Sequence, residues 1–248
     1  MVEQADIISV VDDDKAYGIR NGYYPNYPNR PNCEILTLDE FRQLGIIAPK
    51  PMLDGQDIYI RDPYKPCTYY RIIDENVDKL MVESRSIAVR EALVMMGAKD
   101  IRLYKDIHDT ENSETNAKLG AGVLWANVEG EFNYQKDISL TITQNIESHD
   151  PGRVAESPDA VFTYLREHNL ANDANLIALA ERLQRNGYLS GTETIEVTFL
   201  SELQSALSIL CKLNVKVFNA QLDFNHQQKS THSITQKLSV DFGTRKPQ

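Results

Sequence analysis

The sequence predicts an α+β protein with a mainly antiparallel, twisted sheet, two repeated helix–β-hairpin units and an inserted αα-hairpin. Three observations indicate this class. Apolar and polar side chains alternate over 138–146 and 230–242, as in strands with one buried face. Apolar residues recur every three or four positions over 75–96, as in an amphipathic helix. The third observation is an internal repeat, described below.

The N-terminal residues, 1–66, are expected to form a loop-rich segment with one short helix. Residues 7–11 are mostly β-branched and predict a strand that ends in an acidic turn at 12–14. Residues 18–33 are rich in Tyr, Asn and Pro. Because proline fixes φ and removes a backbone donor, this stretch predicts an extended arm without regular structure.

A short helix over 38–44 follows from Thr37 and Glu40, which fit a capping box. Gly45 stands where such a helix would end. The next apolar residues, 58–60, predict a brief strand between proline-rich turns.

The remaining residues, 67–248, are expected to form the α+β core. Ser157 before Pro158 marks the start of one helix. After a break at Asn172–Asp173, a second apolar stripe predicts another helix, and the two would pair as an αα-hairpin. The other predicted elements are a helix over 75–96, strands over 101–103, 118–134, 138–146 and 195–199, a helix from 201, and strands over 215–226 and 230–242.

The repeat appears when the sequence is compared with itself at a shift of 92 positions. Residues 132–135 (FNYQ) then match 224–227 (FNHQ), and 142–144 (ITQ) match 234–236 (ITQ). Each copy follows a predicted helix. The match predicts duplicated hairpins at about 118–146 and 215–242.

Composition limits the function. The chain has 248 residues, 42% of them hydrophobic, which is enough for a buried core. Its 36 acidic and 26 basic residues give a net charge of −10. Because nucleic-acid binding depends on Lys and Arg at phosphates, no nucleic-acid partner is expected.

Three separated cysteines give no disulfide framework, and the longest apolar run, 92–98, is too short to cross a membrane. The N-terminal residues do not resemble a signal peptide. A cytoplasmic location is therefore expected, and not a constitutive transmembrane protein.

The sequence contains no recognisable catalytic motif, so it favours a protein that is not an enzyme, and neither a cofactor nor a metal is expected. Residues 7–14 (IISVVDDD) resemble the start of a receiver domain, but no helix is expected where a receiver needs one. The five histidines are scattered. A hydrolase or nuclease with dispersed acidic residues stays as an alternative, because acids converge only in three dimensions.

Aromatic residues supply the candidate interface residues Tyr23, Tyr24, Tyr27 and Trp125. A rigid arm with tyrosines suits docking on a partner, although packing against its own domain is an equal alternative for the arm, and the core is the favoured place for the tryptophan. The leading hypothesis is a non-enzymatic self-assembling or protein-binding module, whose partner is a copy of itself or another protein.

The last predicted strand suggests a second function. Long alternating strands also occur in membrane barrels, so a latent β-hairpin pore-forming effector is an alternative. Its candidate membrane-facing residues are Ile234, Leu238, Val240 and Phe242. A sheet with one face on helices and one in water gives the same alternation and is the favoured interpretation.

Overall fold

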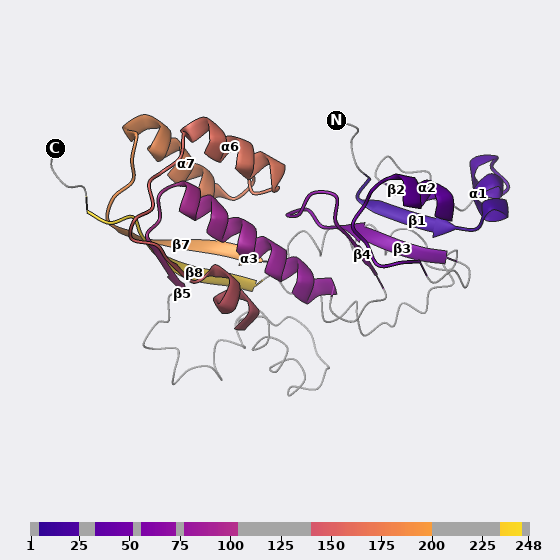
Figure 1. The fold of residues 1–248 in the computed structure, drawn as a ribbon, viewed down its shortest axis with the longest axis horizontal. Helices are drawn as coiled ribbons and strands as arrows, with labels where there is room; N and C mark the ends of the chain where they lie inside the picture. The colour runs from indigo at the N-terminus through magenta and orange to yellow at the C-terminus, as the bar shows by residue number, and fades with distance from the viewer. Residues whose placement is uncertain are drawn as a thin grey trace, which may run out of the picture. The chain divides into compact units, whose positions relative to one another are not determined.

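The computed structural model describes residues 5–24, 33–51, 56–72, 77–103, 140–199 and 234–244. Their helices and strands confirm the α+β class, and the strands form two four-stranded sheets (Figure 1). The described residues divide into two compact units at Ser84 and Arg85, inside one helix. Each unit is described by itself.

The first unit contains a mixed sheet in the order β2-β1-β3-β4. β1 and β2 are parallel, whereas β3 is antiparallel to both of its neighbours. A receiver-type sheet has all its strands parallel, so the resemblance of residues 7–14 ends at β3. The elements are β1 (Ile7–Val11), α1 (Asp13–Arg20), β2 (Cys33–Leu36), α2 (Leu38–Gln43), β3 (Gln56–Arg61) and β4 (Tyr69–Arg71).

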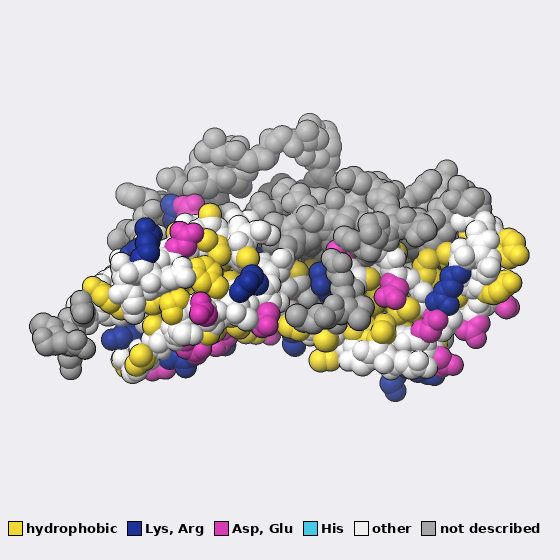
Figure 2. Space-filling model, turned by 90° about the horizontal axis from the view of Figure 1, so that it is seen from above, with side chains coloured by type: hydrophobic (Ala, Val, Ile, Leu, Met, Phe, Trp, Pro, Cys, Tyr) yellow, Lys and Arg dark blue, Asp and Glu magenta, His cyan; other side chains and the backbone are white. Residues whose placement is uncertain are grey.

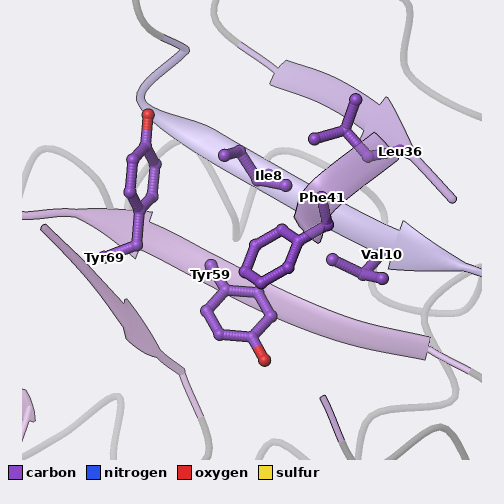
Figure 3. Packing of buried hydrophobic residues seen from close by; sticks show 6 residues of the cluster. All are labelled: Ile8, Val10, Leu36, Phe41, Tyr59 and Tyr69. Atoms are coloured by element: carbon purple, nitrogen blue, oxygen red, sulfur yellow. The ribbon is translucent and has the colours of Figure 1, made fainter. Parts of the chain in front are cut away.

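β1 lies at the centre of this sheet, and all five of its residues are buried. Burial on both faces explains its nearly continuous apolar sequence, IISVV. On one face the ring of Phe41, from α2, lies 4.8 Å from that of Tyr59 on β3 (Figure 3). The buried cluster on this face is Ile8, Val10, Leu36, Phe41, Tyr59 and Tyr69.

The prediction that β1 ends in an acidic turn is wrong, because a helix begins there. Asp12 is the N-cap of α1, and its side chain accepts a hydrogen bond from the backbone N–H of Lys15. Asp13 and Asp14 occupy the first turn, where carboxylates interact favourably with the helix dipole. The same acidic residues that suit a turn therefore start a helix.

The helix and strand predicted after it are confirmed as α2 and β3. Thr37 and Glu40 form the complete capping box, with both reciprocal hydrogen bonds. β4 pairs with β3, so the first sheet extends to residue 71. The domain boundary expected from the sequence is at residue 66.

The second unit contains an antiparallel sheet in the order β6-β5-β8-β7. In this unit α6 and α7 lie next to each other (Figure 1). The elements are α3 (Val77–Met95), whose first residues belong to the first unit, β5 (Asp100–Leu103), β6 (Ser148–His149), α6 (Pro158–Glu167), α7 (Ala174–Asn186), β7 (Thr192–Phe199) and β8 (Ile234–Asp241).

The αα-hairpin of the second unit is built as the sequence predicts. Ser157 caps α6 with Pro158 in its first turn, and Asp173 caps α7. The Asp173 carboxylate also lies 3.3 Å from Arg85 on α3, and both side chains are buried. One acid thus starts α7 and joins it to α3.

Residues 140–146 contradict the predicted strand at 138–146, because they are helical. Ile142 and Ile146, four positions apart, are both buried, and the Asn145 amide donates to the backbone oxygen of Thr141. The apolar residues that fit a strand at every second position also fit a helix at every fourth. The matching segment, 234–236, begins β8, so these two parts of the repeat differ in secondary structure. The rest of both predicted hairpins lies outside the described residues.

Across the described parts of the chain, no helix is both long and apolar enough to cross a membrane.

Candidate protein-binding surface

The C-terminal end of α1 is built by a Schellman motif. The backbone N–H of Tyr23 donates to Gly18 oxygen at 2.9 Å, and that of Gly22 donates to Ile19 oxygen at 3.1 Å. The motif needs a left-handed residue, and Gly22 has φ of 77°. These bonds fix the direction in which the chain leaves the helix, and hence the place of Tyr23.

Three tyrosines gather at this end of α1, and we name Tyr17, Tyr23 and Tyr24 the tyrosine surface. Their exposed fractions are 63%, 70% and 45%. The rings of Tyr17 and Tyr23 lie 6.4 Å apart at 43°. Tyr24 packs against α1 at Gly18, where a Cβ atom would lie 2.6 Å from its ring. Gly18 therefore allows the ring to lie on the helix backbone.

An ion pair holds this end of α1 on the rest of the first unit. Both terminal nitrogens of Arg20 donate to the Glu40 carboxylate on α2, at 3.0 and 2.6 Å. Arg20 also donates to the backbone oxygen of Ile35 on β2, at 2.8 Å. This two-point contact fixes orientation better than a single bond does. The helix that carries Tyr17 is thus fastened at its last residue.

Glu40 has two roles, because it also completes the capping box of α2. The backbone N–H of Thr37 donates to its carboxylate at 2.7 Å. The hydrogen bonds from Arg20 and from Thr37 lower the pKa of Glu40 to about 2. Glu40 is therefore ionised at neutral pH, and Arg20 is neutralised by it.

Acidic residues adjoin the tyrosine surface. Asp13 and Asp14 are exposed and stand four and three positions before Tyr17, which places them on the same side of α1. Hydrophobic and acidic side chains lie side by side at the right-hand end of Figure 2, where Figure 1 shows α1. The surface therefore combines aromatic rings with negative charge.

Two of the predicted interface residues, Tyr23 and Tyr24, belong to this surface. Tyr27 and Trp125 lie outside the described residues. Sequence reasoning missed Tyr17, because it did not predict α1. The cap at Asp12 and the Asn21–Gly22 pair were the features that could have indicated that helix.

The candidate membrane-facing residues belong to β8 and the residue after it. Leu238, Val240 and Phe242 are buried, and Ile234 begins the strand. On neighbouring β7 the same side of the sheet carries Glu193, which pairs with Arg182 of α7. The apolar side of β8 is thus the side on which α7 packs.

Asp62 is a catalytic candidate, because it is a buried carboxyl group. It accepts hydrogen bonds from the Tyr64 backbone N–H at 2.9 Å and from the Tyr70 hydroxyl at 2.8 Å. Burial raises its pKa, although hydrogen bonds, chiefly from Ser84, oppose this. With 2% of its surface exposed, Asp62 does not reach a substrate. We assign it to the interior of the first unit.

Within the described ranges, no three His, Cys, Asp or Glu side chains lie close enough together to hold a metal ion.

Comparison with known proteins identifies no relative: no family model, no curated protein and no solved structure matches this chain.

Proposed function

We propose that this protein is a non-enzymatic protein-binding module, and that the tyrosine surface is its contact surface. The observation that carries the proposal is the grouping of three exposed tyrosines on a fastened helix end. Tyrosine is enriched in protein interfaces, because its ring buries a large area and has few rotatable bonds.

The geometry supports binding in a second way. A surface that is already ordered loses less conformational entropy when a partner binds. Here the Schellman motif orders Tyr23, Gly18 seats Tyr24, and the Arg20–Glu40 pair holds the helix of Tyr17. The backbone that carries the three tyrosines is therefore ordered before contact, and the Tyr24 ring is already packed on α1.

Selection of binders from a library of short random peptides displayed on phage tests this proposal. We expect the wild-type chain to enrich peptides, and the variant Tyr17→Ser/Tyr23→Ser to lose them, since it removes both outer rings. Tyr188→Ser, an exposed tyrosine of the second unit, is the matched control and should retain binding. Enrichment that is equal with and without the two rings would refute the proposal.

The same variants test self-association, the other form of this hypothesis. Native mass is measured by light scattering after gel filtration over a wide concentration range. A mass that rises with concentration in the wild type, but not in Tyr17→Ser/Tyr23→Ser, assigns the surface to contacts between copies. Point variants test the tyrosine surface more specifically than deletion of 18–33, because the deletion would also remove the end of α1 and the first residue of β2.

A further inference from the structure

We infer that the tyrosine surface takes an arginine-rich, positively charged segment of a partner protein; this inference rests on the proposed function. The argument starts from the charge around the rings. Asp13 and Asp14 are exposed and lie beside Tyr17 on α1. A positively charged partner would bring opposite charges to both of them.

The basic residues of α1 do not neutralise Asp13 and Asp14. The guanidinium of Arg20 is bound by both oxygens of Glu40, so it does not compete for the two aspartates. Lys15, the other basic residue of α1, is half-buried. Among the described residues of α1, the exposed charge that is not already paired is therefore negative.

The rings favour the same ligand. The face of a tyrosine ring attracts cations, and arginine stacks on aromatic faces more readily than lysine does. Tyr17 and Tyr23, tilted at 43° to each other, present ring faces in two directions. Aromatic faces beside carboxylates thus provide both the stacking and the charge that a guanidinium group uses.

A second copy of this chain fits the surface less well. In a symmetric contact the same patch meets itself, so Asp13 and Asp14 of one copy would approach those of the other. Like charges brought together in an interface are unfavourable. The net charge of −10 adds repulsion between copies.

The test is a binding titration of the full chain with fluorescent oligoarginine, oligolysine and oligoglutamine peptides of equal length, followed by anisotropy. We expect oligoarginine to bind most tightly and its affinity to fall with salt. Tyr17→Leu/Tyr23→Leu, which keeps apolar area but removes the rings, should weaken binding about tenfold. Asp13→Asn/Asp14→Asn should weaken it about fivefold.

The matched control is Glu167→Gln/Glu181→Gln, which removes the same charge from exposed positions of the second unit. It should leave the affinity unchanged. An equal loss in the control and in Asp13→Asn/Asp14→Asn would mean that only net charge is recognised, and would overturn the inference. Tyr23→Leu alone, outside α1, provides a variant that cannot fail by unfolding that helix.

The two proposals fail in different ways. If oligoglutamine binds as tightly as oligoarginine, or if native mass shows self-association through the rings, the charged partner is wrong and the protein-binding module stands. If phage selection is independent of Tyr17 and Tyr23, the proposed function itself is wrong.

Discussion

Glu40 makes two contacts in the first unit, because its carboxylate completes the capping box of α2 and also binds Arg20. Its pKa, about 2 in the folded chain, is below the value of 4.5 for a free side chain. A lowered pKa means that the ionised form stabilises the fold. This contribution is fully present above pH 4.5 and is lost as the pH falls towards 2.

Glu40→Gln should therefore be less stable than the wild type at neutral pH, by about 1 kcal/mol because the pair is half-exposed. The difference should shrink as the pH is lowered. Urea unfolding of both proteins across this pH range measures it, and Asp39→Asn, a change to an exposed acid of the same helix, is the control. A difference that is the same at acid and neutral pH would contradict the assignment.

Individual residues were predictable where their partners are near in sequence. The capping box of Thr37 and Glu40 spans one helical turn, and the sequence pattern identifies it. The Arg20–Glu40 pair joins α1 to α2, and nothing in the sequence pattern selects these two residues as partners. Tyr23 and Tyr24 were predicted from composition, but only the fold shows that Tyr17 lies beside them.

Among the elements, α3, α6 and α7 were predictable because their apolar residues follow the helical period. For α6 and α7 the capping residues add a second signal. The helix at 140–146 was not predictable, because its two isoleucines fit both the strand period and the helical period. Burial of Ile142 and Ile146 on one side of a helix decides between them. The order of the strands in the second sheet could not be predicted from the sequence either, because β8 pairs with β5 across more than half of the chain.

The buried Arg85–Asp173 pair gives a prediction for the contact of α3 with α7. Arg85→Met should destabilise the second unit by about 3 kcal/mol, because Asp173 would keep a buried charge without this partner. Arg85→Met/Asp173→Asn should recover part of the loss, since asparagine also caps helices.

Urea unfolding followed by circular dichroism measures these losses. Arg90→Met, which breaks a half-exposed pair with its neighbour Glu91, is the control and should cost less. If the double variant is no more stable than Arg85→Met, the buried charge of Asp173 is not the cause of the lost stability.

At the scale of the whole molecule, the described strands form two sheets in two compact units, whereas the sequence suggested one sheet. Ile8 and Val240 are central in their respective sheets, and both are buried. Ile8→Ala should cost about 3 kcal/mol, and Val240→Ala about 2 kcal/mol, through lost burial and the cavity left behind.

Hydrogen exchange should then show faster amides in β1 and β3 for Ile8→Ala, and in β7 and β8 for Val240→Ala. Leu44→Ala, an exposed position, should change neither region. Equal acceleration in both sheets by either core variant would show that the two units unfold as one.

The central position of β8 has a consequence for synthesis. β1 to β4 all lie within residues 7–71, so the four described strands of the first sheet are synthesised close together in time. β5, at 100–103, can pair with β8 only after residues 234–241 have been synthesised, and β8 is also the strand that pairs with β7. Because domains tend to fold as they leave the ribosome, β5 stays without β8 while residues 104–233 are synthesised. A nascent chain stalled between these strands is the form of this protein that chaperones would be expected to recognise.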